Sequence, residues 1–303
     1  MPESIKLDGH RLAEPFHRGP YPAISPLRPE LSQAGKTVVI TGGSMGIGYA
    51  IAQAFVAARA AKIIILARRA ETVSAAAAKL AKEAAAQGSK TEIVGLPCDV
   101  GDAASVAEVW GRLAGEGTVA DVLVLNAAAV APVRTIMELG TARLWEDYTV
   151  NVRGQLDMTE RFYKQRNENG NKLYLVYVST QSIHQWESGK TFPGYGLTKN
   201  AGTAALQVTS HEVPVDRMQM VLYHPGGVLT ESAEKNGFTQ DSLDWDDAAL
   251  PGNFAVWAAS PEAAFLHGRF VWASWDVDGM KNGEVRKRMD EDPYYLQVGV
   301  KGL

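Results

Sequence analysis

The sequence predicts an α/β fold in which a doubly wound parallel sheet of seven strands carries helices on both faces. Short apolar runs recur along the chain without alternating polar positions, which is typical of strands covered on both faces. Helical segments stand between several of these runs and are long enough to cross from one parallel strand to the next. A glycine-rich turn follows the first apolar run, as it does where such sheets bind a ligand.

The seven apolar runs are the expected strands, at residues 38–40, 63–66, 93–96, 122–125, 173–178, 218–223 and 270–272. The expected helices are at residues 46–58, 71–87, 102–115, 141–168, 195–212 and 251–259. The second of these helices is rich in alanine, which is the best helix former, and Gly88 provides its end.

The composition is that of a soluble chain: 46% of the 303 residues are hydrophobic and 21% are charged. A formal net charge of −4 favours neither nucleic acid nor an acidic membrane surface as a partner. Cys98 is the only cysteine, so the chain has no internal disulfide and suits a reducing compartment.

Three segments are expected along the chain. Residues 1–34 form a Pro-rich arm, 35–280 a single domain, and 281–303 a C-terminal tail. The arm contains no apolar run of the kind found in signal peptides or membrane spans. We therefore expect a cytoplasmic protein without a membrane partner.

The turn at residues 41–48 has the context of a dinucleotide site, because it follows a strand and opens a helix. Glycine has no Cβ, so Gly42, Gly46 and Gly48 let the backbone approach a pyrophosphate, and the helix N-terminus offers N–H donors. Between these glycines lie Ser44, Met45 and Ile47. The spacing differs from GxGxxG, and a purely structural strand–helix turn is the alternative.

Two arginines follow the second strand, where an acid would hydrogen-bond the ribose 2′-OH of NAD. Arg68 and Arg69 occupy this position and no acid does. Because a guanidinium group matches phosphate geometry, the pair favours NADP(H) as the cofactor. The alternative is two solvated arginines that open the next helix.

Polar residues also end the third and fourth strands. Asp99, with Val100 beside it, can accept a hydrogen bond from the adenine amino group, and Asn126 can hold the turn beneath the cofactor. Each alone is an ordinary turn former. Their common place at the carboxyl edge of the sheet favours a role in ligand binding.

Tyr195 and Lys199 are four residues apart and share one face of an expected helix. A neighbouring ammonium stabilises phenolate and lowers a tyrosine pKa from its usual value of about 10. Such a tyrosine can transfer a proton near neutral pH. Together with the glycine-rich turn, the pair predicts a dinucleotide enzyme with a tyrosine acid/base.

These segments resemble the short-chain dehydrogenase/reductase family, in its single-domain branch. The Pro-rich arm and the segment GRFVWASWDVDG (268–279) resemble fungal members of that family. The matching motifs span residues 35–275 in the family's order: TGGSMGIG (41–48), CDV (98–100), NAAA (126–129), NVRG (151–154), YGLTK (195–199) and PGGVLT (225–230). The resemblance implies a Rossmann-like fold and a homodimer or homotetramer. It also implies a nicotinamide-side loop with contacts from Pro225, Gly226, Val228 and Thr230.

The resemblance further implies a catalytic tetrad. Tyr195 is then the general acid in reduction, Lys199 lowers its pKa and binds the nicotinamide ribose, and Asn151 holds a water that links Lys199 to solvent. A hydroxyl after the fifth strand binds the substrate carbonyl. Counting from the strand indicates Thr180, whereas counting back from Tyr195 indicates Ser182, which we slightly favour.

The loop before Tyr195 contains His184 and Trp186, which are expected either to line the substrate pocket or to serve as loop packing. Residues 230–250 stand where the family has its substrate lid. The other histidines lack metal-ligand spacing, so no metal is expected.

The sequence as a whole predicts an NADP(H)-dependent oxidoreductase that acts on a small-molecule carbonyl/alcohol pair, with ketone reduction as the favoured direction. One alternative is a non-redox enzyme on the same scaffold, such as a cyclase, isomerase or dehydratase. The other is a non-catalytic protein that senses NADP.

Overall fold

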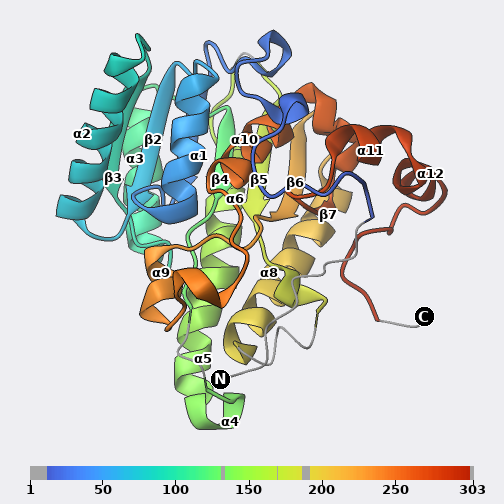
Figure 1. Ribbon diagram of the computed structural model, residues 1–303. Helices are drawn as coiled ribbons and strands as arrows, with labels where there is room; N and C mark the ends of the chain where they lie inside the picture. Colours follow the sequence, from blue (N-terminus) through green and yellow to red (C-terminus); the bar gives the residue numbers. More distant parts are fainter. Residues whose placement is uncertain (1–11, 131–133, 169, 186–191, 301–303) are drawn as a thin grey trace.

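The computed structural model describes residues 12–130, 134–168, 170–185 and 192–300. Seven strands form one sheet in the order β3-β2-β1-β4-β5-β6-β7, and every neighbouring pair is parallel (Figure 1). The strands are β1 Thr37–Thr41, β2 Lys62–Ala67, β3 Glu92–Pro97, β4 Val122–Leu125, β5 Leu173–Val178, β6 Met218–His224 and β7 Arg269–Trp272. The predicted Rossmann-like doubly wound sheet is confirmed.

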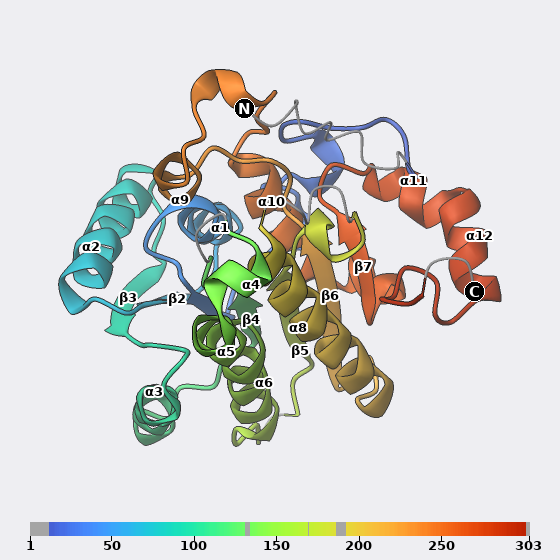
Figure 2. The same ribbon diagram turned by 90° about the horizontal axis from the view of Figure 1, so that it is seen from below.

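Burial explains why these runs carry no polar alternation. Every residue of β4, β5 and β6 is buried, because helices cover both faces of the sheet. Figure 2 shows α1, α2 and α10 on one face and α3, α5, α6 and α8 on the other. The described α-helices are α1 Gly46–Ala57, α2 Ala70–Ala86, α3 Ala103–Gly115, α4 Ile136–Leu139, α5 Thr141–Tyr148, α6 Gly154–Lys164, α8 Pro193–Glu212, α9 Glu231–Lys235, α10 Ala249–Ala258, α11 Val277–Asn282 and α12 Glu284–Glu291.

The helix expected at residues 141–168 differs from the observed structure in its middle and at its end. A π-helical turn, Thr149–Arg153, separates α5 from α6, and α6 ends at Lys164. The π-turn lies against α8, where a Cβ on Gly202 would come within 2.5 Å of the Asn151 carbonyl oxygen. Since π-turns often mark functional positions, this interruption draws attention to Asn151.

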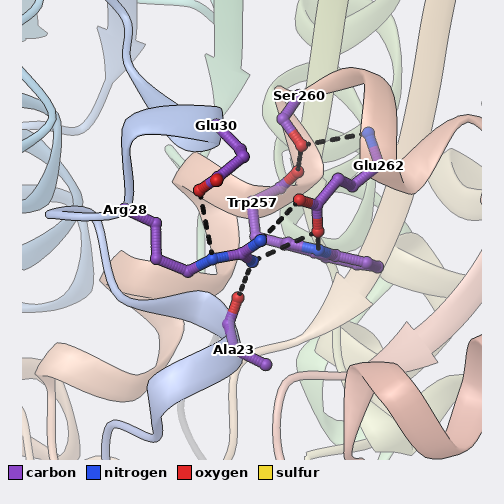
Figure 3. A network of polar contacts seen from close by, with 6 residues as sticks. All are labelled: Ala23, Arg28, Glu30, Trp257, Ser260 and Glu262. Carbon is purple, nitrogen blue, oxygen red and sulfur yellow. Dashed lines mark hydrogen bonds and ion pairs between the residues drawn. The ribbon is translucent and has the colours of Figure 1, made fainter.

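The described part of the arm, residues 12–34, packs tightly on the rest of the molecule. Ile24 and Leu31 are fully buried in the hydrophobic core. Figure 3 shows a second anchor, in which Arg28 Nη2 lies 2.7 Å from Glu262 Oε1 and Trp257 Nε1 donates to the same carboxylate. The arm is thus joined to the segment after α10 by apolar burial and by an ion pair.

Among the described residues, no helix combines the length and the apolar content that a membrane span needs.

Candidate active site

The glycine-rich turn is built for close backbone approach. Gly42 and Gly46 have φ values of +65° and +53°, which favour glycine. A Cβ on Gly48 would lie 2.2 Å from the Gly42 oxygen, so this position admits no side chain. Asn126 Nδ2 donates to the Thr41 and Gly42 oxygens, at 3.1 Å each, and thereby ties the end of β4 to the turn. The segment from β1 into the first turn of α1 also contains Ser44, Met45 and Ile47.

The ends of β2 and β3 lie side by side, since Ala67 pairs with Pro97 in the sheet. Arg68 and Arg69 follow β2 and are exposed, and neither guanidinium pairs with an acid among the described residues. Asp99 follows β3 and accepts from the Gly101 N–H at 2.9 Å. Val100 beside it is buried. The predicted adenosine-side residues therefore share one edge of the sheet.

The loop at residues 225–230 returns over the glycine-rich turn. A Cβ on Gly46 would lie 3.2 Å from Thr230 Cγ2, so the two segments are in near contact. Thr230 caps α9 by accepting from the Ala233 N–H. The loop also carries Pro225, Gly226 and Val228, which brings the expected nicotinamide-side residues to the carboxyl edge of the sheet.

Asn151 and Lys199 lie together under the ends of β4 and β5. The Asn151 side chain is fully buried and bonds the Ala129 N–H and carbonyl, at 2.8 Å each, and Thr198 Oγ1 at 2.9 Å. Lys199 Nζ donates to the Val178 oxygen at 2.6 Å and lies 3.9 Å from the centre of the Tyr177 ring. The water expected at Asn151 stays a prediction.

Tyr195 and Lys199 lie one turn apart near the start of α8, as their spacing predicts. Burial raises the pKa of Tyr195 to about 12 and lowers the pKa of Lys199 to about 7. The expected fall in the Tyr195 pKa is therefore wrong for the polypeptide alone. The physical reason is desolvation of the Tyr195 phenolate, while the Lys199 ammonium is directed at the Val178 carbonyl and the Tyr177 ring.

The two candidate hydroxyls are neighbours, with Thr180 Oγ1 3.4 Å from Ser182 Oγ. Thr180 is buried and caps the short 3-10 turn Gln181–Ile183 by accepting from the Ser182 N–H. Ser182 is only partly buried. Ser179 points away toward α8 and bonds Thr203 Oγ1 at 2.7 Å, which makes its hydroxyl structural.

His184 lies in an aromatic cluster with β7. Trp272 Nε1 donates to His184 Nε2 at 3.4 Å, and the His184 ring meets the edge of Phe270. The expected pocket residue Trp186 lies outside the described residues. Within the described ranges, no group of three His, Cys, Asp or Glu could hold a metal ion.

Three further residues at this edge were missed by sequence reasoning. His224 ends β6, packs edge-on against Trp272, and has its pKa lowered to about 3, mainly by burial and then by His184. Asp246 bonds the loop at residues 225–230, and Arg18 of the arm lies against Asp246. His224 could have been found because it directly precedes Pro225, and Asp246 lies within the expected lid segment 230–250, but no sequence signal marks Arg18.

Comparison with known proteins identifies the family of the chain. The profile of the short chain dehydrogenase family matches residues 36–241. A short chain dehydrogenase/reductase of Aspergillus aculeatus, AacuD, is 34% identical over 290 residues, covering 96% of each chain. A short chain dehydrogenase/reductase of Claviceps purpurea is 35% identical, covering 88% of this chain and 86% of its own.

Solved structures share the fold. L-sorbose reductase from Gluconobacter frateurii, complexed with NADPH and L-sorbose, superposes with a TM-score of 0.69 at 22% identity, covering 80% of this chain and 96% of that one. The RhlG/NADP complex of Pseudomonas aeruginosa gives 0.69 at 20% identity, covering 81% and 97%. The family profile and the fungal relatives together show that this chain belongs to the short-chain dehydrogenase/reductase family, whose members are oxidoreductases.

Proposed function

We propose that this protein is an NADP(H)-dependent reductase that converts a small-molecule ketone or aldehyde to an alcohol, and catalyses the reverse reaction, with Tyr195 as general acid/base. One observation carries the proposal. Hydrogen bonds hold the segment 126–129 between the glycine-rich turn and α8. Asn126 bonds the Gly42 oxygen at one end of this segment, and at its other end the Ala129 N–H bonds Asn151, which in turn bonds Thr198 beside Lys199. The nucleotide turn and the acid/base pair are thus parts of one site.

The described residues fit a dinucleotide. A Cβ would fill the cradle at Gly48, and the α1 N-terminus there offers N–H donors to a pyrophosphate. The unpaired guanidinium groups of Arg68 and Arg69 suit a 2′-phosphate. When bound, the nicotinamide supplies or accepts the hydride. In the proposed complex, Asp99 would contact the adenine, and residues 225–230 would contact the nicotinamide side.

Side chains of the protein would transfer the proton. Tyr195 donates its phenolic proton to the substrate oxygen, which the hydroxyl of Ser182 or Thr180 also binds. A phenol with a pKa near 12 is protonated at neutral pH, as a general acid must be. Lys199 titrates near neutrality and assists when its ammonium turns toward the phenolate. His184 and the aromatic residues around it would border the substrate.

We also propose that the protein is a homodimer or homotetramer. Exposed apolar side chains mark the outer faces of α6 and α8, which lie side by side on one face of the sheet (Figure 2). Leu156 of α6 and Leu197 and Val208 of α8 are among them. An unpartnered apolar surface of this kind fits a second copy of the chain.

Titration with NADPH and NADH, followed by thermal shift, tests the cofactor assignment, because a bound ligand stabilises the native state by mass action. Wild type should prefer NADPH. Arg68→Asp should weaken NADPH binding roughly 10- to 100-fold, the worth of a hydrogen bond to a charged group, and leave NADH binding unchanged. The matched control is Arg166→Asp, which reverses another exposed arginine before β5. Equal losses of affinity for NADPH and NADH would contradict the assignment of Arg68 to the 2′-phosphate.

A panel of ketones and aldehydes then tests the reaction. NADPH consumption that disappears in Tyr195→Phe supports the proposal. Tight NADPH binding with no consumption on any carbonyl would favour the non-redox enzyme or the NADP sensor instead.

A further inference from the structure

Asp246 holds the loop at residues 225–230 through two hydrogen bonds to Gly227, and we call this contact the clamp. The Gly227 N–H donates to Asp246 Oδ2 at 2.8 Å, and the Asp246 N–H donates to the Gly227 oxygen at 2.7 Å. Gly226 has a φ of +91°, and a Cβ on it would lie 2.5 Å from the same carboxylate oxygen. The carboxylate therefore occupies the space beside the loop and fixes its backbone from one side.

The arm supports this clamp. Arg18 Nη1 lies 3.7 Å from Asp246 Oδ1, and the Arg18 carbonyl accepts from the Asp247 N–H at 2.8 Å. On its other side the arm accompanies the end of β7, where the His17 N–H donates to the Ser274 oxygen at 2.8 Å. The arm thus bridges the segment that carries Asp246 and the segment that carries Ser274.

A small cavity lies between these parts. Its lining includes His224, Gly226, Gly227, Asp246 and Ser274, and the arm covers it with Arg18. Three buried polar atoms belong to these residues and have no hydrogen-bond partner among the described residues: His224 Nδ1, Asp246 Oδ1 and Ser274 Oγ. Buried polar atoms without partners are costly, so three of them around one cavity require an explanation.

The size of the cavity supplies that explanation. It leaves about 10 Å³ of room for the centre of a water molecule. A buried water needs about that much space and two to four polar partners. A cation is disfavoured by the Arg18 guanidinium close to Asp246, and an anion by the carboxylate itself.

We propose that this cavity binds one water molecule bridging His224, Asp246 and Ser274, and that Asp246 is thereby a positioning residue for residues 225–230. The water site stands on the contacts alone. Only the consequence for NADPH rests on the proposed function, through the expected place of this loop at the nicotinamide. The arm, which contributes Arg18, is then part of the apparatus that shapes the cofactor site.

A crystal structure of the wild-type protein without cofactor tests the water directly. One ordered water is expected within about 2.7–3.2 Å of at least two of the three orphan atoms. The same water should be lost or displaced in Ser274→Val, whose added methyl groups fill the cavity. Direct bonds among the three side chains, or a dry cavity, would overturn the proposal.

Hydrogen exchange and NADPH affinity test the positioning role. In Asp246→Ala the amides of residues 226–228 should exchange at least tenfold faster, and the Kd for NADPH should rise about tenfold or more, the worth of a charged hydrogen bond. Asp246→Asn keeps an acceptor for the Gly227 N–H and should show a smaller rise, which covers the case that the alanine variant does not fold.

Arg28→Gln is the matched control, because it breaks a different ion pair of the arm, to Glu262, away from the loop. It should lower the melting temperature and leave both loop exchange and NADPH affinity within about twofold of wild type. Equal effects of Asp246→Ala and Arg28→Gln would overturn the positioning role. A wild-type protein that binds no NADPH would refute the proposed function. The exchange rates of residues 226–228 would still test whether Asp246 fixes the loop.

Discussion

Lys199 shows how burial sets acid–base behaviour at the scale of one residue. Its folded-state pKa is about 7, against an unfolded value of about 10.4. Between these values the unfolded chain binds more protons, so stability rises with pH. Below pH 7 the ammonium is charged in both states and its burial lowers stability in full.

Urea unfolding of wild type and Lys199→Met across about pH 6 to 10 checks this prediction. The stability of wild type relative to the variant should rise with pH, by at most about 1.4 kcal/mol per unit. His224 and Tyr195 also titrate in the unfolded chain, but wild type and variant share both groups, so their contributions cancel in this difference. Lys164→Met, at an exposed lysine, should show no such trend. Parallel curves for Lys199→Met and wild type would contradict the buried, neutralised lysine.

The two neighbouring hydroxyls give a second prediction at this scale. Ser182→Ala should lower kcat about 10²-fold, the usual loss of one donor to a developing oxyanion. Thr180→Ala should cost less in kcat, since its hydroxyl also caps the turn before His184. Ser179→Ala should leave kcat intact and lower stability by about 1 kcal/mol through its lost bond to Thr203. Near-normal rates in both Ser182→Ala and Thr180→Ala would show that neither hydroxyl binds the substrate carbonyl.

The types and spacing of these residues could be predicted from the sequence, but their electrostatics could not. Tyr195 and Lys199 share a helix face because they are four apart. The direction of their pKa shifts depends on burial, which arises when the fold packs α8 against β5 and sets Lys199 beside Tyr177 and Val178. No local pattern carries that information.

At the scale of elements, the turn between β1 and α1 leaves no room for a side chain at Gly48. Gly48→Ala should disrupt the turn and abolish NADPH binding, because its Cβ would meet the Gly42 oxygen at 2.2 Å and Asn126 Nδ2 at 2.5 Å. Gly111→Ala in α3 is the control, since nothing lies within 4 Å of its Cβ. It should stabilise the protein by about 0.5–1 kcal/mol. Thermal melts with and without NADPH measure stability and binding in both variants. Normal NADPH binding in Gly48→Ala would show that this turn is not part of the NADPH site.

The strands were predictable to within one residue at each end, because continuous apolar runs mark buried parallel strands. The π-turn at Thr149–Arg153 was not, since it depends on the packing of α5 and α6 against α8. The short helices α4, α9, α11 and α12 contain four to eight residues and are too short to show a helical period.

At the scale of the whole molecule, the proposed oligomer can be tested at the exposed apolar side chains of α6 and α8. Val208 of α8 has 60% of its surface exposed, although it is apolar. If this face is covered by a second copy, Val208→Arg places a charge in the interface and should give monomers in analytical ultracentrifugation. Leu27→Arg is the control, because Leu27 is 76% exposed on the arm. Identical assembly of Val208→Arg and wild type would place the interface elsewhere.

The fold class of the molecule was predictable, whereas the docking of its arm was not. Apolar runs alternate with helical segments along the chain, and this local pattern predicts a doubly wound sheet. The arm instead reaches partners more than 200 residues away, such as Glu262 from Arg28 and Asp276 from His17. Contacts of that separation leave no periodic trace in a single sequence.

The docked arm also has a consequence for biosynthesis. Tyr21 is buried and its hydroxyl donates to the Trp275 carbonyl, 254 residues later in the chain. A ribosome therefore makes the arm more than 200 residues before the segment on which it docks. The nascent arm has no docking partner until β7 and the residues after it have been synthesised. Arg18 can reach its place beside Asp246 and residues 225–230 only then, so the proposed nucleotide pocket is completed late in synthesis.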